Sequence, residues 1–170
     1  QVMTTLPDTG CPAWVQTNPG GSGYWVAAPG AEALLRLARA PALSAGEALA
    51  LVGDARLLHE AGLADTPTLL ALLRALAEHP RREVVTEAAR ALAALAPLRD
   101  DSPAGAYAAQ WQALFGARAR ALGWQARAGD GDDERLLRAA LLPWVAELGE
   151  DAALRADARR LAEAWLADPA

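Results

Sequence analysis

The sequence predicts a mainly α-helical protein, an irregular solenoid of stacked antiparallel helix hairpins that follows a short N-terminal β-hairpin segment. Ala and Leu make up 44 and 28 of the 170 residues and favour helices, while Ile is absent. From residue 31 onward, apolar residues recur with helical spacing. Before residue 30, short aromatic and β-branched runs alternate with glycine- and proline-rich turns. We therefore divide the chain into a β-hairpin segment, residues 1–29, and a helical domain, residues 30–170, which we expect to be partial.

The N-terminal segment contains three strand-like runs, QVMTTL, CPAWVQT and GYWVAA, separated by the turn signals PDTG and NPGGSG. The glycines of NPGGSG do not form a phosphate loop, because strand-forming residues follow them and the Gly-Lys-Ser/Thr pattern is missing. They permit a positive φ in a hairpin that presents Tyr24 and Trp25 to a neighbouring layer. Strands this short need such a layer. We expect it to be the helical part of the chain or an upstream sheet, with Trp14, Tyr24 and Trp25 as interdomain contacts.

Capping residues and apolar stripes predict where each helix begins and ends. The first is expected at residues 31–40, and the second follows the tetrad SAGE, in which Ser44 and Glu47 form a capping box, and ends at Gly62. Thr66-Pro67 begins the third, which stops before Pro80. The fourth spans residues 82–96.

Three further helices complete the domain. Ser102-Pro103 begins one whose stripe ends at Gly123, and the acidic loop GDGDDE begins another that ends at Gly149. The stripe residues are Tyr107, Trp111, Leu114, Phe115 and Leu122. The last helix is expected to turn five residues inward: Leu154, Ala158, Leu161, Ala162 and Trp165. The short connections predict hairpins starting near residues 44, 82 and 132, in a solenoid rather than a four-helix bundle.

Composition excludes several classes of function. The net charge is −5 with all 16 basic residues Arg, so nucleic acid and anionic membranes are poor partners. The apolar runs are too short for membrane insertion, and the single Cys11 excludes an internal disulfide. The chain begins at Gln1, from which we expect a processed chain or an excised fragment. The compartment stays open between bacterial cytoplasm and periplasm.

We predict no catalytic residues, no metal ligands and no cofactor in this chain. The string HEAGL at residues 59–63 lacks the second histidine of H-E-x-x-H, and His79 is distant. The acidic run at residues 130–134 lacks the glycine and glutamate spacing of an EF-hand, and we interpret it as a helix cap. Arg155, Arg159 and Arg160 form a basic cluster. We interpret it as a solvated face, with capture of a peptide carboxylate as the weaker alternative.

Three stretches, in order, resemble zinc aminopeptidases of the puromycin-sensitive and membrane-alanyl type. WVQTNPGGSGYWVAA resembles W-V-x-x-N-x-G-x-x-G-Y-Y-R, with Trp25 for the second tyrosine and Val26 for the arginine. LSAGEALALVGDA resembles L-S-x-x-E-R-x-x-L-x-x-D-A, with Ala48 for the arginine. The third stretch, LGWQARAGDGDDERLLRAALL, resembles the succession L-G-W, G-E-x-D-D and L-R-x-x-L-L, with Asp130 for the glutamate. The matching residues are Trp14, Val15, Asn18, Gly20, Gly23 and Tyr24; Leu43, Ser44, Glu47, Leu51, Asp54 and Ala55; and Leu122, Gly123, Trp124, Gly129, Asp132, Asp133, Leu137 and Arg138.

This resemblance implies the edge of a β-sandwich followed by part of a HEAT-like helical domain. It implies that the family's zinc and catalytic residues lie upstream. It also implies that this segment packs on the catalytic and β-sandwich domains of a bacterial parent enzyme and forms a wall of that enzyme's peptide chamber. Peptide substrates would then be indirect partners. The alternative is a free-standing helical-repeat adaptor that binds a protein in its concave face. A small hydrolase with an acidic pair is a weaker third reading.

Overall fold

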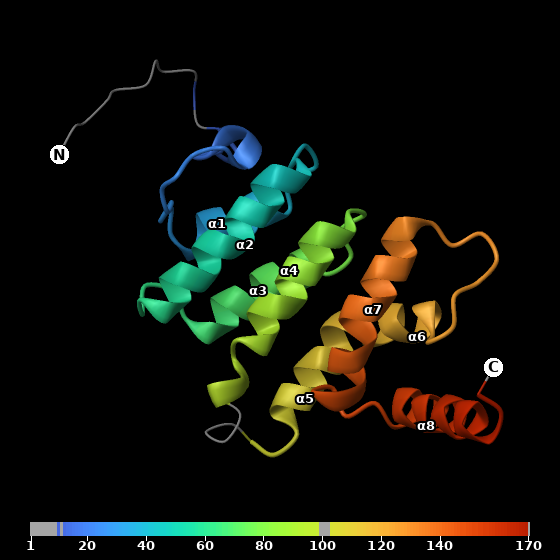
Figure 1. Cartoon of the computed structure of the whole chain (residues 1–170). Coiled ribbons are helices and arrows are strands. Elements are labelled where there is room, and N and C mark those ends of the chain that lie inside the picture. The colour runs from blue at the N-terminus through green and yellow to red at the C-terminus, as the bar shows by residue number, and fades with distance from the viewer. Residues whose placement is uncertain (1–9, 11, 99–102, 170) are drawn as a thin grey trace.

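The helices lie in two layers (Figure 1). The computed structural model describes residue 10 and residues 12–98 and 103–169. One layer contains α2 (Ala45–Glu60), α4 (Arg82–Ala93) and α7 (Asp132–Glu147). The other contains α1 (Ala31–Ala38), α3 (Thr66–Leu76) and a long helix made of α5 (Ala106–Trp111), η3 (Gln112–Gly116) and α6 (Ala117–Leu122). The last helix, α8 (Ala152–Ala167), packs on α7. With α5, η3 and α6 counted as one, the described residues form seven helices, as predicted.

Consecutive helices alternate between the layers. Within the layers, α2 packs on α4, α4 on α7, and α1 on α3, while α3 contacts both α2 and α4 from the opposite layer. The result is the predicted solenoid of stacked hairpins. Because the layers alternate along the chain, helix pairs can be counted from α1 or from α2. The packed pairs α2–α3 and α7–α8 begin near the predicted residues 44 and 132.

The helix ends follow their local sequence. The predicted capping box is present at α2: the Glu47 N–H donates to Ser44 Oγ (3.3 Å) and the Ser44 N–H to Glu47 Oε2 (2.9 Å). α3 begins at Thr66 as expected, and Asp65 caps it by accepting from the Thr68 N–H (2.8 Å). Gly62 has a φ of +71° just after α2, as the glycine at a helix end requires.

The core lies between the two layers and is built from Leu, Val, Ala and a few aromatics. Four of the five predicted stripe residues are buried: Tyr107, Trp111, Leu114 and Phe115. The fifth, Leu122, is half-buried. The rings of Trp111 lie 5.6 Å from Phe115 and 6.0 Å from Trp144, centroid to centroid, which joins the two layers by aromatic packing.

The long helix contains a π-helical turn, η3, that the sequence pattern did not predict. Its backbone stays in the right-handed helical region on both sides, so the axis continues from α5 into α6. Gln112 lies in this turn and donates through Nε2 to the Gly149 carbonyl (2.7 Å), which ties the turn to the end of α7. Such turns are uncommon and are often retained where they place side chains.

The expected β-hairpin is absent from the described residues 12–29, and its part at residues 1–9 and 11 lies outside the described residues. A short 3-10 turn, η1 (Pro19–Gly21), stands at the expected hairpin tip. The Asn18 side chain closes it, with Oδ1 accepting the Gly23 N–H (2.7 Å) and Nδ2 donating to the Gly23 carbonyl (3.2 Å). Side-chain bonds therefore take the place of strand pairing here.

The expected inward face of α8 is largely uncovered. Leu154 is the buried residue of this helix, whereas Trp165 is 62 % exposed. In the described part of the chain, α7 is the helix that packs on α8. The rest of the apolar stripe of α8 therefore has no covering layer there. Among the described helices, none has the length and apolar character needed to cross a lipid bilayer.

Candidate functional site

The predicted interdomain residues lie on an exposed surface at the N-terminal end. We define the aromatic surface as Trp14, Val15, Tyr24, Trp25 and Val26, all of them exposed. Tyr24 is fully exposed and Trp25 is 56 % exposed. Five exposed large apolar residues within residues 14–26 make this stretch the candidate contact surface of the described chain.

Trp25 is the member of the aromatic surface that the turn itself orients. Its indole N–H donates to the Thr17 carbonyl (3.2 Å). Its ring lies over Gly23, where a Cβ would come within 2.2 Å of ring carbons. A side chain at position 23 would therefore displace the Trp25 ring, which is a different reason for glycine here from the positive φ that the sequence suggested.

Two carboxylates of α2 hold the segment that carries the aromatic surface. Glu47 Oε1 accepts the Gly20 N–H (3.0 Å), and Asp54 Oδ2 accepts the Ala27 N–H (3.1 Å). The bonds from Gly20 and then from Ser44 hold the pKa of Glu47 below its ordinary value. Burial raises the pKa of Asp54, although the bond from Ala27 opposes this effect. Both carboxylates belong to the motif residues found in the sequence.

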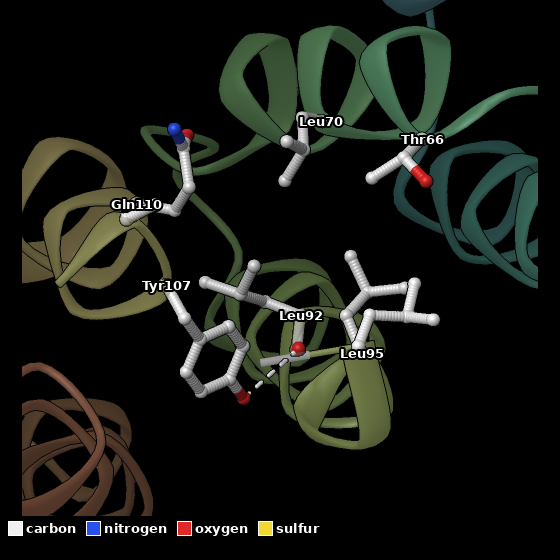
Figure 2. Close-up of a pocket in the computed structure, with 8 residues that line it drawn as sticks. Thr66, Leu70, Leu92, Leu95, Tyr107 and Gln110 are labelled. Carbon is white, nitrogen blue, oxygen red and sulfur yellow. Dashed lines mark hydrogen bonds between the residues drawn. The ribbon is translucent and has the colours of Figure 1, made fainter. Parts of the chain in front are cut away.

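An apolar cavity of about 140 Å³ lies between α3, α4 and α5 (Figure 2). Leu70 of α3, Leu92 of α4 and Leu95 face into it. Tyr107 of α5 borders it and donates through its hydroxyl to the Leu92 carbonyl (3.2 Å). Gln110 lies at the edge toward α3, and its Oε1 is buried without a hydrogen-bond donor among the described residues. Sequence reasoning did not identify this cavity, although a glutamine within the apolar stripe of α5 is an available signal.

A second hollow adjoins this cavity and shares Leu70 and Gln110 with it. Arg39 and Arg74 line it, and within the described part of the chain neither guanidinium has a carboxylate within ion-pair distance. Cavity and hollow together form a groove between α3 and α5 with an apolar part and a cationic part. It lies beside the end of α1 and far along the chain from the aromatic surface.

The predicted basic cluster on α8 is divided among different partners. Arg155 donates to the carbonyls of Ala146 (2.7 Å) and Glu147 (3.0 Å) and so caps the C-terminal end of α7. Arg159 forms the expected pair with Glu163 at 3.7 Å, and Arg160 pairs with Asp157 at 3.3 Å. Capture of a peptide carboxylate by these residues stays a prediction.

The third motif stretch is organised around Arg138 of α7, which is 7 % exposed. Its guanidinium donates to the Gly123 carbonyl (2.8 Å) and pairs with Asp130 at 2.5 Å. The Trp124 indole N–H donates to the Leu154 carbonyl (2.8 Å), which links the same loop to α8. These contacts explain why Gly, Trp, Asp and Arg occur together in this stretch.

Each histidine has a local structural contact. His59 Nε2 lies 3.0 Å from Thr66 Oγ1, and His79 Nδ1 accepts the Arg81 N–H at 3.2 Å. Within residues 10, 12–98 and 103–169, no three His, Cys, Asp or Glu side chains are grouped as metal ligands.

Comparison with known proteins gives one family. The sequence profile of the ERAP1-like C-terminal domain matches residues 14–170. No curated protein and no solved structure matches the chain. The match begins at Trp14, the first residue of the aromatic surface, and includes all three motif stretches.

Proposed function

The chain belongs to the family of ERAP1-like C-terminal domains, the non-catalytic helical C-terminal part of aminopeptidases, and from this we propose a specific role for it. It is the C-terminal scaffold of a bacterial zinc aminopeptidase and forms a wall of the chamber in which the parent enzyme removes N-terminal residues from peptides. The zinc and the catalytic groups belong to the parent's catalytic domain.

The aromatic surface carries this proposal. Its five apolar side chains are exposed, and no backbone hydrogen bond joins residues 24–29 to another described segment, apart from the Ala27 N–H bonded to Asp54. Unpaired backbone beside exposed aromatic and β-branched side chains is suited to packing against, or pairing with, a sheet of another domain. The partner we propose is the β-sandwich domain of the same parent, with the catalytic domain beyond it.

Association with the rest of the parent tests this role. The chain is mixed with a polypeptide that carries the parent's upstream domains, and affinity is measured by calorimetry. We expect the triple substitution Trp14→Ser, Tyr24→Ser, Trp25→Ser to weaken association at least about tenfold, because it removes most of the buried apolar area. Trp165→Ser, at an exposed tryptophan on α8, is the matched control and should leave the affinity unchanged.

Peptidase assays test the non-catalytic assignment. We expect no release of nitroaniline from aminoacyl-nitroanilides by the purified chain with added zinc, and we expect release once the upstream domains are present. Turnover by the 170-residue chain alone would overturn the proposal.

The groove between α3 and α5 supports the second candidate, an adaptor that holds a partner protein. Its apolar cavity is one feature of a binding surface. Arg39 and Arg74 are another, since neither has a carboxylate within ion-pair distance among the described residues. Leu70→Asp places a charge in the groove, whereas the triple Ser variant leaves the groove intact. If partner binding is lost in Leu70→Asp and retained in the triple Ser variant, the adaptor is favoured. If binding is retained in Leu70→Asp and lost in the triple Ser variant, the scaffold is favoured.

A further inference from the structure

We propose that Glu47 and Asp54 of α2 are positioning residues that form one cooperative two-point clamp. The clamp fixes residues 18–27 on the helix and thereby sets the orientation of the aromatic surface. The interdomain consequence rests on the proposed function, whereas the clamp itself does not.

The spacing of the two carboxylates carries the first step. Glu47 and Asp54 are two helical turns apart, so they project from the same face of α2. Their bonded N–H groups, on Gly20 and Ala27, have the same separation along the segment. The helix therefore holds this segment at both ends by its backbone, independently of which side chains the segment carries.

Close backbone contact supports the clamp at its first point. A Cβ on Gly21 would lie 2.3 Å from the Gly46 carbonyl oxygen, and one on Gly46 would lie 2.7 Å from the Gly20 oxygen. The turn thus rests directly on the first turn of α2. The Gly20 N–H can reach Glu47 because neither glycine carries a side chain there.

Among the described residues, the hydrogen bonds between this segment and the helices are those of the clamp. Hydrogen bonds from residues 12–29 otherwise stay within the segment, such as those of Asn18 with Gly23 and of Trp25 with Thr17. The hydrogen bonds that leave the segment in the described part of the chain end on Glu47 or Asp54. If one of these two hydrogen bonds is lost, the other must order a longer free segment. Each bond therefore lowers the entropic cost of forming the other.

Cooperativity predicts an effect at a distance. We compare Glu47→Ala, Asp54→Ala and the double variant in the 170-residue chain, and follow amide hydrogen exchange of Gly20 and Ala27 by NMR. We expect each single substitution to accelerate exchange at both amides by about tenfold or more, and the double variant to add little beyond either single. Amides of core residues such as Leu72 and Leu92 serve as the reference for intact folding.

Two matched variants separate the clamp from general effects on α2. Ser44→Ala removes the hydroxyl half of the capping box but leaves Glu47 facing Gly20, so exchange at Ala27 should not change. Asp54→Asn keeps an acceptor oxygen for Ala27 and should retain most of the protection. Acceleration at Ala27 by Ser44→Ala would indicate fraying of α2 and would overturn the clamp.

The outcomes distinguish the clamp from the proposed function. If Glu47→Ala accelerates exchange at Gly20 and leaves Ala27 protected, the two points act independently and the clamp is wrong. Unprotected Gly20 and Ala27 amides in the unsubstituted chain would overturn it equally. Coupled exchange together with unchanged association with the parent's upstream domains would support the clamp and contradict the interdomain role.

Discussion

The segment at residues 18–27 and the loop at residues 123–131 are both held by side chains that bond to backbone, but with opposite polarity. Carboxylates of α2 accept backbone N–H groups of the first, whereas the Arg138 guanidinium of α7 donates to backbone carbonyls of the second. Arg138 is buried and also pairs with Asp130, while Glu47 is only half-buried. The loop is thus a fixed part of the fold, and the segment is an attached outer layer suited to contact with another domain.

The largest effect is expected from Arg138→Met. Removal of the guanidinium leaves the Gly123 and Leu122 carbonyls without their charged donor. We expect the free energy of unfolding to fall by about 2 to 3 kcal/mol, measured by urea denaturation. Arg135→Met on the exposed side of α7 is the control and should change it by less than about 0.5 kcal/mol. Equal effects of the two variants would show that Arg138 does not fix the loop.

Alanine substitutions at two neighbouring glycines test how closely the segment at residues 18–27 rests on α2. Gly20 and Gly21 both have positive φ, of +70° and +67°, so alanine at either should cost about 1 to 2 kcal/mol of local opening free energy. Gly21→Ala should cost more, because its Cβ also meets the Gly46 carbonyl, whereas the space at Gly20 is open. Hydrogen exchange at the Gly23 amide measures this opening. A Gly20→Ala effect as large as that of Gly21→Ala would contradict the close contact.

The smallest expected effect is a difference in pH dependence between the two carboxylates. Burial raises the pKa of folded Asp54, so the stability it contributes is present in acid and is lost as the pH rises through the folded pKa. At neutral pH, the Asp54→Asn variant should therefore be more stable than the unsubstituted chain, by less than about 1 kcal/mol. The difference should vanish well below the ordinary carboxyl pKa of about 4.

Glu47 should behave in the opposite way. Its pKa is lowered in the folded protein, so its contribution is present above the ordinary carboxyl pKa and is lost as the pH falls through the folded value. At neutral pH, the Glu47→Gln variant should be less stable than the unsubstituted chain. The stabilities of the two proteins should become equal in acid. Thermal unfolding of both variants and the unsubstituted chain, measured from acid to neutral pH, tests both predictions. If stability changes with pH in the same way for both variants, the opposite pKa directions of Glu47 and Asp54 are contradicted.

Local chemistry made the helices predictable. Ser44 with Glu47, the glycine after α2 and Glu134 in the first turn of α7 each bond to free backbone groups of a nearby helix end, and those signals lie within a few residues of each other. The helices end one to three residues earlier than expected where a final tighter turn replaces α-helical bonds, as after α4.

The contacts that the sequence did not predict are those between distant residues. Glu47 is recognisable as a capping residue, but its second bond, to Gly20, depends on how the N-terminal segment folds back. The hairpin prediction was wrong in the described residues for the same reason, because strand propensity in Tyr24, Trp25 and Val26 is realised only when a partner strand is present. The cavity beside Gln110 likewise arises from three helices that only the tertiary packing brings together.

The π-helical turn at Gln112–Gly116 determines where the following arginines point. One extra residue in the turn rotates α6 about its own axis. Arg118 then reaches the Ala77 and His79 carbonyls beyond α3, while Arg120 reaches Asp151 before α8. Deleting one residue from this turn would restore a uniform helical register and swing both arginines away from their partners. The contacts of the long helix with the α3–α4 loop and with the start of α8 therefore depend on a single extra residue.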